Sequence, residues 1–246
     1  MGDKYYAGNG GYPVGWTGLN TPRQQVQEFE YAVLAEDDQG ERIEDYLDDS
    51  QVEKLARGVQ VPQGWDGIAV VPKPQKLAPL YRGRFKGFQY NQAYAHMLQL
   101  LMRYFGLRSD PGLAFGTDQD TACSKLYQKL LAQPGDYMVF AAQLGRVHPD
   151  RRLDHEMKRL SVFEVPMDGY LAVGILIANP KRLTSVDDSG ISCPGAHLRD
   201  RPNRIPVLRR AGIQRSDGRI DDECLQVKHL PITEPGWMAT ARIPGI

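Results

Sequence analysis

The stretch NQAYAHMLQLLMRYF, residues Asn91 to Phe105, gives the clearest structural signal in the chain. Its apolar members recur at the spacing that places them on one face of a helix. These members are Tyr94, Met97, Leu98, Leu101, Met102 and Phe105. Gly106 follows, and glycine commonly ends a helix. We therefore expect a helix with one face in the core and with His96 exposed on the opposite, polar side.

Around this helix the sequence predicts a second helix at 121–132 and several strands. Runs of β-branched and aromatic residues bounded by proline or glycine indicate strands. These runs are 67–71, 137–142, 160–165, 170–178 and 224–230. Asp168-Gly169 lies between the third and fourth runs and favours a hairpin there. Helices and strands without an alternating βαβ order predict an α+β fold: an antiparallel or mixed sheet with two principal helices and long irregular arms.

The chain is divided by composition into an arm and a domain. Residues 1–20 are rich in glycine and tyrosine, so we expect a flexible arm, followed by a single α+β domain over 21–246. Thr21-Pro22-Arg23-Gln24 has the form of a helix-starting capping box, yet the residues after it also alternate like a strand. Ser50 is expected to cap a short helix that ends at Gly58. Residues 179–222 hold many Pro, Gly, Asp and Arg, which predicts loop or extended arm.

Composition limits the classes of protein. The chain has 246 residues, 41% of them hydrophobic, with 30 basic and 30 acidic side chains, which is typical of a globular protein. The longest apolar run, Tyr170 to Ala178, is far shorter than the roughly 20 residues that span a bilayer. The N-terminus has no apolar leader, so we expect a cytoplasmic protein and no membrane partner. The three cysteines lack C-x-x-C spacing, so we expect no zinc site, and no cofactor motif is present.

Charge is segregated along the chain although it cancels in total. Residues 24–53 hold eleven acids and one base, 54–108 nine bases and one acid, and 199–219 seven arginines and two aspartates. Such a layout suits a basic surface that binds a polyanion. It also suits association with protein partners or a homo-oligomer, in which the acidic 24–53 block docks on a basic neighbour. A third possibility is that the segments fold against one another and cancel.

The segment YRGRFKGFQY, residues Tyr81 to Tyr90, interleaves three bases with four aromatic rings. If it is extended, bases and rings share one face, and single-stranded nucleic acid needs that combination. The candidate nucleic-acid-binding residues, including the arginines of the 199–219 region, are Tyr81, Arg82, Arg84, Lys86, Phe88, Tyr90, Arg199, Arg201, Arg204, Arg209 and Arg210. The alternative for Tyr81–Tyr90 is an edge strand with its rings in the core. The leading hypothesis is a non-enzymatic protein that binds single-stranded nucleic acid with little sequence preference.

Residues 148–158 are the strongest candidates for catalysis. His148, Asp150, Asp154 and His155 are chemically adequate Zn or Mn ligands, which would indicate a metal-dependent hydrolase or nuclease. Their spacing instead favours a short, charge-rich helix in which Asp150 or Asp154 pairs with a neighbouring base. We therefore assign neither catalytic nor metal-binding residues. The assembly subunit and the metal-dependent enzyme remain as alternatives to nucleic-acid binding.

Overall fold

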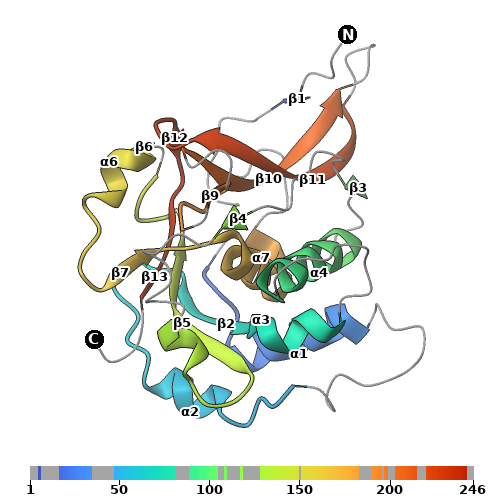
Figure 1. The fold of residues 1–246 in the computed structure, drawn as a ribbon, viewed down its shortest axis with the longest axis vertical. Coiled ribbons are helices and arrows are strands. Elements are labelled where there is room, and N and C mark those ends of the chain that lie inside the picture. Colours follow the sequence, from blue (N-terminus) through green and yellow to red (C-terminus); the bar gives the residue numbers. More distant parts are fainter. Residues whose placement is uncertain are drawn as a thin grey trace.

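The computed structural model has the predicted α+β architecture (Figure 1). It describes residues 5–6, 17–34, 47–80, 89–104, 108–109, 117–118, 128–149, 151–182, 190–195, 197–198, 203–214 and 220–242. Among these residues, no helix is both long enough and apolar enough to cross a membrane.

One sheet is fully antiparallel and has the strand order β2-β5-β13-β7. Its strands are β2 (Gly67–Pro72), β5 (Tyr137–Leu144), β13 (Ala239–Arg242) and β7 (Glu164–Pro166). The predicted strands at 67–71 and 137–142 are therefore confirmed. The predicted strand at 160–165 is present only in its last two residues, which begin β7.

A second, mixed sheet is built on the long antiparallel pair β10 (Arg204–Gln214) and β11 (Ile220–Pro231). β1 (Tyr5–Tyr6) and β8 (Ile191–Ser192) pair with β10, and β3 (Arg108–Ser109) runs parallel to β11. Two small pairs complete the strands. They are β6 (Arg151–Arg152) with β12 (Pro235–Gly236), and β4 (Thr117–Asp118) with β9 (His197–Leu198).

The prediction of loop or arm over 179–222 was wrong for β10. Ile205, Val207 and Leu208 of this strand are buried, so it belongs to the core. Arginines and Pro206 interrupt the apolar alternation, and they hid the strand from a pattern search. Pairing with β11 along the whole length of β10 supplies the hydrogen bonds that make the strand stable.

Helices pack against the strands and against one another. They are α1 (Pro22–Leu34), α2 (Val52–Arg57), α3 (Pro74–Leu77), α4 (Gln89–Tyr104), α6 (Leu153–Met157) and α7 (Gly169–Ala178), with 3₁₀ turns η2 (Ala78–Leu80) and η3 (Pro180–Arg182). α4 confirms the helix expected at 91–105. Residues 128–131 are also helical, in agreement with the end of the helix expected at 121–132, whose first seven residues lie outside the described part.

The start of α1 resolves the ambiguity of the sequence in favour of a helix. The backbone N–H of Thr21 donates to Gln24 Oε1 at 3.1 Å, and that of Gln24 donates to Thr21 Oγ1 at 3.4 Å. This is the reciprocal capping box. The helix ending at Gly58 is also present, but its N-cap is Gln51, without a side-chain cap, and not Ser50 as expected.

The run Tyr170–Ala178 is helix α7 and not the predicted strand. The Asp168 carboxylate accepts a hydrogen bond from the backbone N–H of Leu171 at 2.8 Å, so Asp168-Gly169 starts a helix and forms no hairpin turn. All ten residues of α7 are buried, and a helix buried on all sides has no polar face to reveal its period. This correction places a helix at the centre of the fold.

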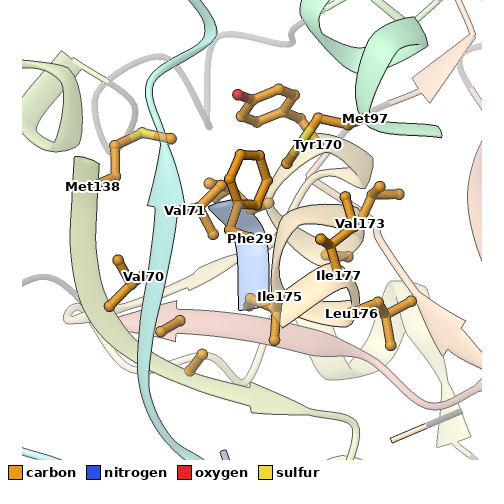
Figure 2. Close-up of a cluster of buried hydrophobic side chains, with 14 of the residues drawn as sticks. Phe29, Val70, Val71, Met97, Met138, Tyr170, Val173, Ile175, Leu176 and Ile177 are labelled. Atoms are coloured by element: carbon orange, nitrogen blue, oxygen red, sulfur yellow. The ribbon is translucent and has the colours of Figure 1, made fainter. Parts of the chain in front are cut away.

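α7 contacts α1, α4, β2 and β10, so the main core forms around it (Figures 1 and 2). Phe29 of α1, Val71 of β2 and Met97 of α4 lie against it. At Gly174 a Cβ atom would come within 2.5 Å of Val71 Cγ1 and 2.7 Å of Met97 Cε. The absence of a side chain at this glycine lets the helix fit between the strand and α4.

Two glutamine side chains make hydrogen bonds to the backbone of the antiparallel sheet that a neighbouring strand would otherwise make. Gln25 of α1, fully buried, donates to Ile68 O at 2.6 Å and accepts from Val70 N at 3.0 Å. Gln133 pairs in the same two-way manner with the N–H and C=O of Val139, at 2.8 Å each. The backbone groups of both strands thereby gain partners where no neighbouring strand supplies them.

Gln25→Leu is expected to lower the free energy of unfolding by about 2 to 4 kcal/mol, because Val70 N–H and Ile68 C=O lose their buried partner. Urea denaturation of the two proteins measures this difference. The matched control is Gln27→Leu, an exposed position of the same helix, for which a change within about 0.5 kcal/mol is expected. Equal stability of the Gln25→Leu variant and the wild type would contradict the role given to this side chain.

Candidate functional site

Most of the predicted nucleic-acid-binding segment lies outside the described residues. This holds for Tyr81, Arg82, Arg84, Lys86 and Phe88, and also for Arg199 and Arg201. Tyr90 lies in the first turn of α4. The expectation that Tyr90 continues an extended, alternating face was therefore wrong, because the helix begins at Gln89, two residues before its predicted start.

The other three predicted residues lie on β10. Arg209 and Arg210 are consecutive, and consecutive positions of a strand belong to opposite faces of its sheet, while positions 204 and 210 belong to the same face. At about 3.3 Å per residue, Arg204 and Arg210 are roughly 20 Å apart along the strand. Arg204 and Arg209 are half-buried. The three arginines are therefore spread along one strand and do not form a compact cluster.

Helix α6 lies next to the start of β10. Leu153 of α6 and Ile205 of β10 are buried together with Met238 in a small second core. The backbone N–H of Asp154 donates to Ile232 O at 3.0 Å, and that of Ile232 donates to Asn203 O at 2.8 Å. These contacts bring Arg204 beside the β6–α6 segment.

The inward face of α6 is set by helical spacing. Leu153 is fully buried and Met157 packs against the same small core, while Glu156 is buried toward the antiparallel sheet. The remaining positions of the segment face outward. The exposed side chains described between 146 and 159 are Arg146, Val147, Arg151, Arg152, His155, Lys158 and Arg159.

We call Arg151, Arg152, Lys158 and Arg159 the α6 basic surface. The Arg152 guanidinium pairs with Asp154 at 2.9 Å, which confirms the predicted charge-rich helix in which Asp154 pairs with a neighbouring base. Arg151 and Arg159 have side chains that are 59% and 67% exposed and approach Glu156 Oε1 at 3.6 and 3.2 Å. Exposed acid is sparse here: Glu234 lies alongside, and Asp150 is outside the described residues.

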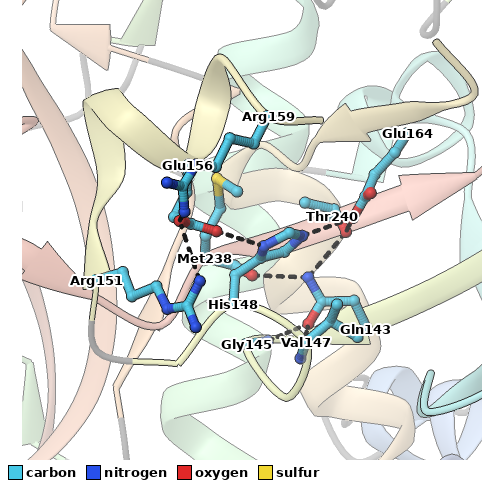
Figure 3. Close-up of polar contacts among 10 residues, drawn as sticks. All are labelled: Gln143, Gly145, Val147, His148, Arg151, Glu156, Arg159, Glu164, Met238 and Thr240. Carbon is cyan, nitrogen blue, oxygen red and sulfur yellow. Dashed lines mark hydrogen bonds and ion pairs between the residues drawn. The ribbon is translucent and has the colours of Figure 1, made fainter. Parts of the chain in front are cut away.

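Behind this surface a histidine lies between two glutamates (Figure 3). His148 Nδ1 is 2.9 Å from Glu156 Oε2, and His148 Nε2 is 2.9 Å from Glu164 Oε1. The side chains of Glu156 and Glu164 are 5% and 12% exposed. We call these three residues the Glu–His–Glu cluster.

Thr240 and Gln143 extend the cluster into the sheet. The Thr240 hydroxyl donates to Glu164 Oε1 at 2.6 Å and accepts from Gln143 Nε2 at 2.8 Å. Gln143 also donates to Met238 O and accepts from the backbone N–H groups of Gly145 and Val147. The turn that carries His148 is thus fixed to β5 and β13, which defines where the imidazole sits.

The geometry requires an extra proton in the cluster. A neutral imidazole has one N–H donor and one acceptor nitrogen, whereas a carboxylate can only accept. Two carboxylates at 2.9 Å from the two ring nitrogens are therefore satisfied together only when both nitrogens carry hydrogen, as in imidazolium.

The electrostatic environment agrees with a charged His148. Burial disfavours the charge, but hydrogen bonds and charge from Glu164 and Glu156 outweigh it and raise the pKa of His148. Burial alone would raise the pKa of Glu156 and of Glu164. The hydrogen bonds to His148 lower the pKa of both carboxyls, with further lowering by Thr240 for Glu164 and by Arg151 and Arg159 for Glu156. The cluster is therefore an ionised, hydrogen-bonded triad.

In this arrangement the cluster can bind a proton. Both nitrogens of His148 are engaged, so it has no lone pair with which to act as a base on a substrate in this arrangement. Across the described residues, no three His, Cys, Asp or Glu side chains gather as a metal ion would require. His148 and Asp154, two of the candidate ligands, face Glu side chains and Arg152 instead.

His96 is buried, with 3% of its surface exposed, so the expectation of an exposed histidine was wrong. Burial, together with the charge of Arg103, lowers the pKa of His96 to about 4, so this residue is neutral near pH 7. α4 packs against α3, α1 and α7, which cover more of its circumference than one apolar face. His96, a polar residue at the margin of the apolar stripe of α4, is therefore buried.

Sequence reasoning missed the residues that complete this site. The density of bases between 146 and 159 could have identified the α6 basic surface, but the segment was tested only for metal ligands. Glu164, Thr240 and Gln143 had no such signal, since they reach His148 or each other from separate strands.

Comparisons with protein-family models, curated protein sequences and solved structures found no match to this chain. The functional conclusion therefore rests on the residues described above.

The raised pKa of His148 gives its contribution to stability a defined pH range. The contribution is fully present below the ordinary value of 6.5 and is lost as pH rises through the raised, folded-state pKa. The lowered pKa values of Glu156 and Glu164 set the acid limit of the same pH range. The contribution of these two carboxylates to stability is present above 4.5 and is lost as pH falls through their folded-state pKa values. All three groups stabilise the fold together between 4.5 and 6.5.

His148→Gln is expected to lower the free energy of unfolding by about 3 kcal/mol at about pH 6, since it removes one partner of a buried charge cluster. The difference from wild type should shrink by about pH 9, where the wild-type imidazole has lost its charge. Urea titrations at both pH values measure it. His155→Gln, which alters an exposed histidine of α6 outside the cluster, should match wild type within about 0.5 kcal/mol. A His148→Gln difference that grows with pH would contradict the charged cluster.

Proposed function

We propose that this protein binds nucleic acid, single-stranded and with little sequence preference, through the α6 basic surface. The observation that supports this most is that basic side chains are exposed around α6 while the nearby carboxylate is buried. Arg151, Arg152, Lys158 and Arg159 are exposed, whereas the carboxylate of Glu156, which two of them approach, is turned inward toward His148. Exposed arginines recognise phosphate oxygens through charge-assisted, often bidentate, hydrogen bonds.

The protonated cluster makes this surface more favourable for phosphate. His148 carries a positive charge that offsets Glu156 from behind, so the buried carboxylate takes up less of the charge of Arg151 and Arg159. The guanidinium groups are then held in place by Glu156 while their exposed edges face solvent. Positioned cations of this kind bind the backbone of a polyanion and leave its sequence unread.

The start of β10 offers a continuation of the basic surface, because Arg204 begins this strand beside α6. Arg209 and Arg210 follow farther along the strand, at positions that belong to opposite faces of the sheet. Contacts to phosphates alone do not favour single strands over duplexes, because stacking on exposed bases needs aromatic rings. The basic and aromatic segment Tyr81–Tyr90 remains the proposed source of that stacking.

The second function proposed from the sequence is an assembly subunit that docks through its acidic 24–53 block. Six of the eleven acids of that block lie outside the described residues. Among the described ones, Asp48, Asp49 and Glu53 lie close in sequence to Lys54 and Arg57, which reduces the local negative charge. Measurement of mass at low and high salt tests this alternative: a salt-sensitive oligomer with no affinity for oligonucleotides would replace nucleic-acid binding.

The double variant Arg152→Gln, Lys158→Gln is expected to bind a fluorescent oligonucleotide more weakly than wild type. The slope of log affinity against log salt concentration should be shallower than in wild type by roughly 0.7 for each phosphate that is no longer neutralised, which is about 1.4 for the two side chains. Fluorescence anisotropy between about 50 and 200 mM salt measures both effects. Neither side chain is paired with the Glu156 carboxylate in the structure, and surface ion pairs such as Arg152–Asp154 contribute little to stability.

The matched control is Lys54→Gln, Arg57→Gln, which removes the same charge from two exposed positions of α2, the helix at the bottom of Figure 1 and away from α6. This control should keep wild-type affinity apart from a small general effect of net charge. Equal weakening in the two double variants would show that only total charge matters and would reject the α6 basic surface as the site.

The triple variant Arg82→Ala, Arg84→Ala, Lys86→Ala tests the second part of the proposal. Removal of three cationic side chains should reduce the salt slope by roughly 2 units, with about 0.7 for each phosphate they neutralise. A wild-type slope in this variant, measured in the same assay, would remove the Tyr81–Tyr90 segment from the binding site and leave α6 alone.

A further inference from the structure

We propose that the Glu–His–Glu cluster is a proton-operated control of the α6 basic surface: nucleic acid binds tightly when the cluster holds its extra proton and weakly when that proton leaves. This inference rests on the proposed function of that surface. It adds a regulatory group, His148, that does not itself touch the nucleic acid.

The cluster links the basic surface to the sheet. Glu156 belongs to α6, Glu164 to β7, and His148 lies in the segment between β5 and β6. The backbone carbonyl of His148 also accepts from Met238 N at 3.3 Å, just before β13. Through this one imidazole, α6 is tied to a rigid antiparallel sheet (Figure 3).

The described charged groups that contact or approach the cluster come from several elements. α6 contributes Glu156, the turn after α6 contributes Arg159, β6 contributes Arg151, and β7 contributes Glu164. β5 and β13 contribute the uncharged Gln143 and Thr240. Asp150, two residues away in sequence, lies outside the described residues. With a protonated imidazole these groups comprise three positive and two negative charges; without that proton the charges balance.

Departure of the proton must break one of the two hydrogen bonds of His148. A neutral ring can donate to only one carboxylate, and its other nitrogen then directs a lone pair at the second. Glu164 has a further donor in Thr240 and is fixed in β7 by pairing with β13. Glu156 has its further donor in Arg159, which belongs to the same segment and can move with it. Glu156 is therefore the partner that separates from His148.

The consequence for phosphate is electrostatic. A Glu156 carboxylate that has separated from His148 relies on Arg151 and Arg159 alone for neutralisation, so these guanidinium groups are occupied internally. A bound phosphate would then compete with the Glu156 carboxylate for these two guanidinium groups, which disfavours binding. By linkage, nucleic acid bound at this surface must in turn hold the proton on His148 more tightly.

Oligonucleotide affinity measured at about pH 6 and about pH 8.5, on either side of the ordinary histidine range, tests the inference. Wild type should bind about fivefold or more tightly at the lower pH, the usual lower limit for coupling between two sites. His148→Gln should bind with the same affinity at both pH values, because the titrating group is gone. His155→Gln, which removes an exposed histidine of α6 outside the cluster, should keep the wild-type ratio.

Glu164→Gln provides a second variant in case His148→Gln does not fold. A neutral imidazole can donate Nδ1–H to Glu156 and accept from the amide of residue 164, so the extra proton is no longer required. The midpoint of the pH dependence of binding should therefore move to lower pH than in wild type. Thermal unfolding of each variant at both pH values verifies that the folded protein is being compared.

The outcomes separate this inference from the proposed function. Wild-type binding that is equal at the two pH values overturns the inference and leaves nucleic-acid binding intact. A pH dependence that persists in His148→Gln, or that disappears in His155→Gln, assigns the effect elsewhere and also overturns it. An oligonucleotide that binds at neither pH overturns the proposed function and the inference together.

Discussion

A single imidazole held between two carboxylates connects the parts of the protein around α6. His148 contacts Glu156 and Glu164 at 2.9 Å on both sides, and with both carboxyls ionised these contacts are satisfied when each ring nitrogen carries a hydrogen. The contacts tie α6 to β7, while Thr240 and Gln143 tie the same group to β13 and β5. The position of α6, and with it the exposed arginines, follows from this arrangement.

Several buried polar side chains complete the hydrogen bonding of the backbone elements around them. Gln25 and Gln133 complete the hydrogen bonding of two strands with side-chain amides, and the apolar helix α7 fills the space between the sheets. Near α6 the core is small, with Leu153, Ile205 and Met238 as its buried members. Here ion pairs supplement apolar burial, so this end of the fold depends more strongly on pH than the core around α7 does.

The sequence allowed prediction of the elements whose patterns are set by a single buried face. The stripe of α4, the prolines around β2 and the aliphatic run of β5 each identified an element correctly. α7 was mistaken for a strand because it is buried on every side, and β10 was taken for loop because arginines interrupt its apolar residues. Single-face periodicity carries no information in either case.

The candidate site was less accessible to sequence reasoning. The short charge-rich helix was expected from the spacing of Asp154 and its neighbours, and the Arg152 ion pair agrees with it. The Glu–His–Glu cluster depends on Glu164, sixteen residues from His148, and on Thr240, which contacts Glu164 across 76 positions of the chain. No local pattern encodes such pairings, because they arise only when β7 and β13 lie side by side. The arrangement of exposed arginines around the buried Glu156 carboxylate at α6 could therefore be recognised only in the folded structure.

The protonation state of His148 tests this account most directly. Nitrogen-15 NMR of histidine-labelled protein distinguishes an imidazolium, with two protonated nitrogens, from a neutral ring with one. We expect both nitrogens of His148 to carry hydrogen at the ordinary histidine pKa of 6.5, and one of the two hydrogens to leave only at higher pH. A ring that is already neutral at pH 6.5, with a single N–H, would contradict the charged cluster and the control of the basic surface built on it.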